Sequence, residues 1–84
     1  MLTVLPLPNE LVRIVNKHGL RRKFRKQCEL ISRNWRHPSL RVERLEPKEV
    51  GLCSFRIDRK YRAIFFFRED EEAIEIVDVT VHYQ

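Results

Sequence analysis

The chain has 84 residues and a formal net charge of +5, and 43% of its residues are hydrophobic and 35% charged. This length suits one small domain, which we take to span residues 1–84, and the composition is typical of a globular rather than a disordered protein. The positive charge favours a polyanionic partner: nucleic acid, an anionic membrane surface or an acidic protein.

Several features argue against other classes of protein. Cys28 and Cys53 lie far apart without a C-x-x-C pair, so we interpret them as buried free thiols in a reducing cytoplasm rather than as zinc ligands. The N-terminal sequence MLTVLPLPNEL has no cationic start followed by a long apolar run, and it predicts neither a signal peptide nor a membrane span. With only two glycines there is no Gly-rich phosphate loop. We therefore expect a cytoplasmic protein without a metal or cofactor.

The N-terminal half is predicted to be mainly helical. A short strand over Leu2–Leu5 is limited by two prolines and confined to a sheet edge. Asn9 is the expected N-cap of a helix that reaches His18, and Gly19 suits the left-handed position after it. A second helix follows, with its apolar stripe at helical spacing and an end near Trp35 or Arg36, since a later proline disfavours helix. The residues of the stripe are Leu20, Phe24, Cys28, Ile31 and Trp35.

The opposite face of the second helix is basic and has three readings. It is a solvated face, a face that contacts RNA, or the docking surface of an acidic partner. The residues concerned are Arg21, Arg22, Lys23, Arg25 and Lys26.

The C-terminal half is predicted to form strands. The segment 41–45 alternates loosely and is a candidate second strand, and the segment 53–57 alternates cleanly between apolar and polar residues. After a polar turn at 58–60, the nearly all-apolar segment 61–67 is expected to be a central strand, buried on both faces except where Arg62 emerges. The charged tip REDEE precedes a last strand over 73–79. The order β-α-α-β-β-β predicts a two-layer α+β fold, with a short N-terminal strand and a helical hairpin packed on a twisted, mainly antiparallel four-stranded sheet.

Polar residues that interrupt these strands are the candidates for chemistry, because one face of such a sheet stays free of helices. Arginine can hold a phosphate, histidine can act as acid or base, and without a metal the cleavage of a phosphodiester would use the 2′-hydroxyl of RNA. Each candidate also has an ordinary explanation: Arg56 can pair with Asp58 or Glu75, and the terminal His-Tyr can be a frayed tail. The candidates are Glu43, Arg56, Arg62, His82 and Tyr83.

Taken together, the segments HPSL, R-x-E-x-L, GLCSFRIDRKYRAIFFF and AIEIVDVTVHYQ resemble the RelE/ParE superfamily of toxins, and most of all its YoeB-type and RelE-type messenger-RNA endonucleases. The resemblance implies a helical hairpin on a small antiparallel sheet, cleavage of messenger RNA in the ribosomal A site without a metal, and silencing by a cognate antitoxin. It further implies a general base at Glu43, a phosphate contact at Arg62, a general acid at His82 and substrate orientation by Tyr83. Arg56, Arg59 and Lys60 would bind RNA.

The chain departs from the pattern at one point: Ser54 and Arg56 stand where RelE-type toxins have two lysines, so one cation is missing. The ParE branch of the superfamily shares the fold but acts on DNA gyrase. Two alternatives to an endoribonuclease therefore stay open, a gyrase-binding toxin and a binding module for RNA without turnover. The terminal His82-Tyr83 favours the endoribonuclease.

Overall fold

A computed structural model describes residues 1–68, 70 and 72–81 of the chain. Within them the elements follow the order β-α-α-β-β-β-β, with a short 3-10 turn on either side of the second strand. The elements are β1 (Thr3–Val4), α1 (Asn9–Lys17), α2 (Arg21–Arg33), η1 (Pro38–Leu40), β2 (Glu43–Arg44), η2 (Lys48–Val50), β3 (Cys53–Arg56), β4 (Tyr61–Arg68) and β5 (Ala73–Val81).

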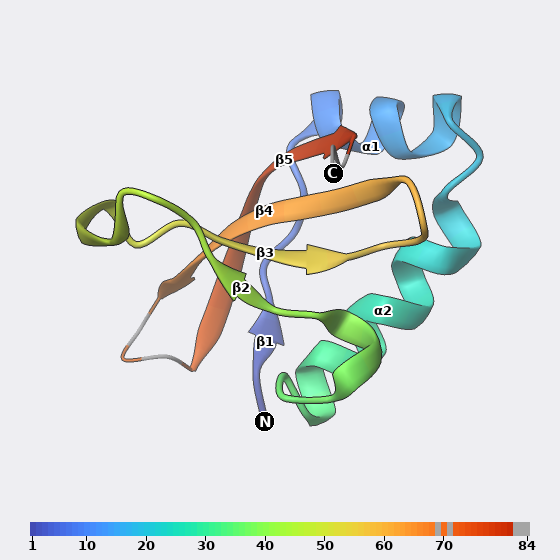
Figure 1. Ribbon diagram of the computed structural model, residues 1–84. Coiled ribbons are helices and arrows are strands. Elements are labelled where there is room, and N and C mark those ends of the chain that lie inside the picture. Colours follow the sequence, from blue (N-terminus) through green and yellow to red (C-terminus); the bar gives the residue numbers. More distant parts are fainter. Residues whose placement is uncertain (69, 71, 82–84) are drawn as a thin grey trace.

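The described strands form one five-stranded sheet in the order β1-β5-β4-β3-β2 (Figure 1). The pairings are antiparallel except that of β1 with β5, which is parallel. The α+β class is thus confirmed, and the expected count of four strands was wrong. The fifth strand is β2, in which Glu43 and Arg44 pair with β3. It lies within the segment 41–45, a candidate strand in the sequence that the expected order β-α-α-β-β-β left out of the sheet. The edge position of β1 and the central position of β4 agree with the sequence.

The helix boundaries differ slightly from those expected. The N-cap of α1 is Pro8 rather than Asn9, because the carbonyl of Pro8 accepts the N–H groups of Leu11 (3.0 Å) and Val12 (3.1 Å) and no described side chain caps the helix. Gly19 has a φ of 65°, the left-handed conformation predicted for it. Helix α2 ends at Arg33, before the expected Trp35 or Arg36, since its C-cap Asn34 already has an extended φ of −155°.

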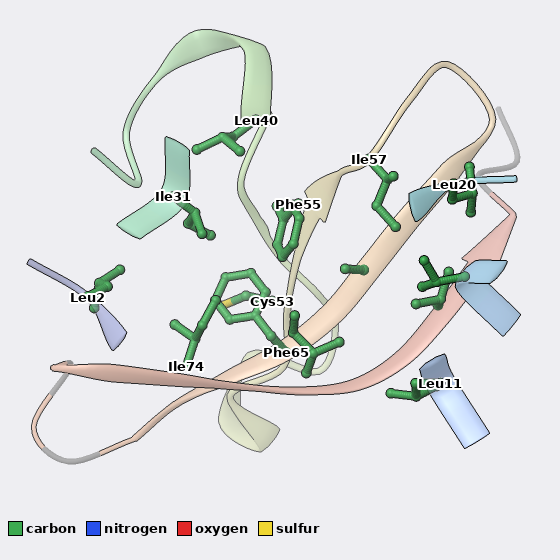
Figure 2. Close-up of a cluster of buried hydrophobic side chains, with 14 residues drawn as sticks. Leu2, Leu11, Leu20, Ile31, Leu40, Cys53, Phe55, Ile57, Phe65 and Ile74 are labelled. Atoms are coloured by element: carbon green, nitrogen blue, oxygen red, sulfur yellow. The ribbon is translucent and has the colours of Figure 1, made fainter. Parts of the chain in front are cut away.

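The core lies between the helices and one face of the sheet (Figure 2). Phe55 of β3 and Phe65 of β4 are fully buried there, with ring centroids 5.8 Å apart, and Ile31 of α2 is equally buried. A register shift in the β4–β5 pairing lets Ile76 and Val79 both reach this core although they are three residues apart. No described helix is long and apolar enough to cross a membrane.

Alternation along the strands sends the remaining side chains to the other face of the sheet, which we call the open face. In the register, Glu43 lies opposite Ser54, and Arg56 lies opposite Arg62. These positions alternate with the buried Phe55 and Ala63. The fold therefore brings polar residues from β2, β3 and β4 together on the open face.

Candidate nucleic-acid interface

Arg62 is the centre of the polar cluster on the open face. The sequence predicted that its side chain would emerge from the buried strand, and this was wrong, because the residue is buried. Only 6% of the residue is exposed. Its guanidinium Nε donates to the hydroxyl of Ser54 (3.1 Å), and its Nη2 donates to the backbone carbonyl of Arg41 (2.5 Å). These bonds offset the free-energy cost of burying a charge. Without such partners, an arginine in an apolar strand would point outward to keep its guanidinium in water.

The bond to Arg41 ties a strained loop to the sheet. Arg41 follows η1 and has a φ of 45°. This left-handed conformation is energetically unfavourable for any residue other than glycine. Because Arg62 holds the carbonyl of Arg41, it also positions the short segment that leads to Glu43. The other N–H groups of Arg62 make no hydrogen bond within the described residues, so part of the guanidinium stays available to an anion.

The electrostatic surroundings of Arg62 are strongly positive. Burial lowers the pKa of Arg62 below its ordinary value; Glu43 raises this pKa, and the charges of Arg56 and Arg41 lower it further. Within the described part of the chain, three arginines thus interact around a single carboxylate. An excess of positive charge at a partly shielded site attracts a phosphate or another anion.

Glu43 and Arg56, two further candidates from the sequence, both interact with the charge of Arg62, and Arg56 lies opposite it in the sheet. Glu43 is exposed and lies across β3 from β4, so its carboxylate is accessible to a substrate on the open face. The Nε of Arg56 donates to the backbone carbonyl of Asp58 (3.2 Å), and neither carboxylate proposed as its partner forms an ion pair with it among the described residues. Glu75 instead binds Arg68 at 2.8 Å. The charge of Arg56 is therefore not neutralised by these acids.

The turn from β3 to β4 is built around Asp58. Its Oδ1 accepts the backbone N–H groups of Lys60 (2.8 Å) and Tyr61 (2.7 Å), and its Oδ2 lies 3.6 Å from the Nζ of Lys23 in α2. Burial acts to raise the pKa of Asp58, but these N–H groups and Lys23 together hold it below its ordinary value. This carboxylate fixes the turn, and it presents Arg59 and Lys60 as exposed cations.

His82 and Tyr83, the predicted acid and its neighbour, lie outside the described residues. The described part of β5 ends at Val81, which lies opposite Tyr61, next in sequence to Arg62.

The hydroxyl of Tyr61 is 3.1 Å from Nδ1 of His18, a pair that sequence reasoning missed. The partners of Arg62 were also missed: the alternation of β3 indicated where Ser54 would point, but nothing in the sequence indicated Arg41. The described residues hold no group of three or more His, Cys, Asp or Glu side chains that could bind a metal ion.

Comparisons with known proteins point to one fold. No protein-family model matches the chain, and no curated protein matches it either. Among solved structures, the chain is similar to a YoeB/ParE toxin from Agrobacterium tumefaciens, with a TM-score of 0.70, 15% identity and 98% of each chain covered. It is also similar to a YoeB dimer from Staphylococcus aureus, with a TM-score of 0.64, 23% identity, and 98% of this chain and 95% of that one covered. The chain therefore has the fold of the YoeB and ParE toxins.

Proposed function

We propose that the protein is the toxin of a type II toxin–antitoxin system and an endoribonuclease that cuts messenger RNA in the ribosomal A site. The observation that carries this proposal is the buried Arg62, held on the open face with Arg56 and the carboxylate of Glu43 interacting with it. A fixed cation beside an accessible carboxylate supplies two of the groups that phosphodiester cleavage needs.

The proposed reaction uses the substrate's own nucleophile. Glu43 accepts the proton of the RNA 2′-hydroxyl, whose oxygen attacks the adjacent phosphorus. Arg62, with Arg56 beside it, stabilises the negative charge that develops on the phosphoryl oxygens. The bond to the 5′-oxygen breaks, and His82 supplies the proton for this leaving group while Tyr83 orients the substrate. The products are a 2′,3′-cyclic phosphate and a 5′-hydroxyl, and no metal or cofactor takes part.

The test is cleavage of a messenger programmed in the A site of purified ribosomes, without added metal beyond what the ribosome needs. We compare the wild type with Arg62→Gln and His82→Ala, and with Arg68→Gln as a matched control at the far end of β4. Removal of Arg62 or His82 should lower the rate at least 100-fold, as loss of a charge-stabilising group or of a general acid does. Cutting that persists in His82→Ala would overturn the proposed mechanism.

A second candidate is a gyrase-directed toxin, favoured by the similarity to the Agrobacterium tumefaciens protein, whose name joins YoeB and ParE. Inhibition of gyrase supercoiling by a wild type that cuts no messenger would support it. A module that binds RNA without turnover would fail both assays. The mechanism proposed above is preferred because a gyrase-binding surface has no need of the Glu43 carboxylate beside Arg62.

A cognate antitoxin is the proposed protein partner, alongside messenger RNA and the ribosome. An acidic segment of such an antitoxin, helical or extended, would bind the basic face of α2 or the open face, where opposite charge favours rapid association. Purification of the chain with the product of its neighbouring gene tests this. Failure of the two purified proteins to associate at low salt would count against a toxin.

A further inference from the structure

A second cationic site lies at the edge of the sheet, outside the Arg62 cluster. A pocket of about 390 Å³ is open between α2 and the β3–β4 turn. We call it the edge pocket. Its charged lining residues are Lys23, Lys26, Arg56, Asp58 and Arg59.

One side of the edge pocket is held in place by hydrogen bonds from Gln27 to the backbone. Gln27 of α2 is only 7% exposed, and its Nε2 donates to the backbone carbonyls of Arg56 (2.8 Å) and Ser39 (3.3 Å). Strand β2 is too short to pair with β3 at Arg56, so Gln27 takes the place of a neighbouring strand there. The helix is thereby fastened to the end of β3, as Figure 1 shows for the course of α2 beside the β3–β4 turn. The cations of the edge pocket are thus held at defined positions of the backbone.

The charges of the edge pocket do not balance. Among the residues that the structure describes, four cations line it against the single carboxylate of Asp58, which is already bound to two backbone N–H groups and to Lys23. Lys26 and Arg59 are exposed and have no side-chain hydrogen bond or ion pair within the described part of the chain. The pocket therefore favours an anion, which Lys26 and Arg59 are free to bind.

Arg56 belongs to both sites. It lines the edge pocket, and it lies opposite Arg62 in the sheet and interacts with its charge. A polymer with an anion at every unit can therefore occupy both sites at once. Of the pocket's lining, Ile57 is the one purely aliphatic side chain among the described residues, and it is 3% exposed. An amphipathic protein segment would find little apolar surface there.

We propose that the edge pocket binds a phosphate of the same RNA strand whose scissile phosphate lies at Arg62. This inference rests on the proposed function for the identity of the strand, and it adds α2 to the RNA-binding surface through Lys26. The pocket would hold the backbone of the RNA, so it should contribute affinity independently of base sequence.

The test measures binding without cleavage. A fluorescent single-stranded RNA with 2′-O-methyl riboses cannot be cut through its 2′-hydroxyl, and its fluorescence anisotropy reports affinity at several salt concentrations. The edge variant carries Lys26→Gln and Arg59→Gln. The control carries Arg13→Gln and Lys17→Gln, which remove the same charge from exposed positions on α1. Circular dichroism verifies that both variants fold.

We expect the edge variant to bind about tenfold more weakly or worse, for RNAs of any sequence, and its salt slope to fall by roughly 0.7, the contribution of the one phosphate that the variant no longer neutralises. The control should keep most of its RNA affinity and most of its salt slope. Equal losses in the two variants would show that only net charge matters and would overturn the inference. Unchanged RNA binding combined with lost binding of a Glu-rich peptide would assign the edge pocket to a protein partner and overturn it as well.

Failure of this inference is distinguishable from failure of the proposed function. The anisotropy assay needs neither the ribosome nor His82, so a wild type that cuts no messenger can still show the selective loss in the edge variant. Conversely, if messenger is cut and both His82 and Arg62 are required while the edge variant binds RNA normally, the proposed function stands and the edge pocket is not an RNA site.

Discussion

Phe65 and Arg62 lie three residues apart on β4 and are both buried, at 0% and 6% exposure, by different physical means. Phe65 faces the helices and packs against other aromatic rings, with Phe55 and Phe67 at centroid distances of 5.8 and 5.3 Å. Arg62 faces the open side, where hydrogen bonds to Ser54 and Arg41 accompany its burial. The helix-facing side supplies stability, whereas the open face uses burial to hold a charge in a fixed place.

The largest effect on stability should come from the apolar side of this comparison. Phe65→Ala removes a fully buried ring and leaves a cavity, which should lower the free energy of unfolding by about 3–5 kcal/mol. Urea denaturation measures it. Phe66→Ala is the matched control, since Phe66 is half-buried and on the other face. A loss no greater than that of the control would contradict the picture of a core on the helix side alone.

A smaller but more informative effect is expected at Arg62. Arg62→Met keeps the bulk of the side chain but leaves the hydroxyl of Ser54 and the carbonyl of Arg41 without their donor, at a cost of about 2 kcal/mol. Ser54→Ala in the same protein should cost less than it does alone, because the hydroxyl has already lost its partner. A double-mutant cycle should give a coupling of about 0.5–1.5 kcal/mol. Strict additivity of the two losses would mean that the Arg62–Ser54 bond contributes nothing to stability.

The next effect is expected at Asp58 and should depend on pH. Asp58→Ala removes the acceptor of two turn N–H groups, which should lower the free energy of unfolding by about 1–2 kcal/mol. Asp58→Asn keeps an acceptor oxygen and removes only the charge. The folded-state pKa of Asp58 lies below its unfolded value of about 3.9. The stability due to the charge is therefore present above that value and is lost as the pH falls through the folded-state pKa.

Thermal denaturation between pH 7 and pH 2 measures this difference. The gap between the wild type and Asp58→Asn should close in acid, whereas the gap between Asp58→Asn and Asp58→Ala should persist. A gap that widened as the pH fell would have the opposite sign and would show that the pKa of Asp58 is raised.

The smallest effect should come from the ion pair of Arg68 with Glu75. Both side chains are nearly half exposed, at 48% and 45%, so water and salt screen their 2.8 Å contact. Glu75→Gln should change the free energy of unfolding by less than about 1 kcal/mol, and by less still in 1 M salt. A loss of stability as large as that caused by Asp58→Ala would contradict the expectation that the exposed carboxylate of Glu75 contributes less than that of Asp58.

Much of this molecule could be predicted from local pattern. The stripe of α2 predicted the buried Leu20 and Ile31, and the alternation of β3 predicted the buried Phe55 and Ile57. The conformation of Gly19 followed from its place after a helix. Such predictions succeed because the burial of an apolar side chain depends mainly on the period of its own element.

The surroundings of the charged residues required the tertiary structure. Arg62 is buried because Ser54 and Arg41, eight and 21 residues away in sequence, bring it acceptors. The edge pocket exists because Gln27 reaches the carbonyl of Arg56, 29 residues further along the chain. The sequence by itself determined much of the core and that Glu43, Arg56 and Arg62 would interrupt the strands, whereas it did not indicate the fully buried Leu40. Only the fold decided which charges are buried, paired or left free, because a polar side chain takes its position from hydrogen-bond partners that local periodicity does not specify.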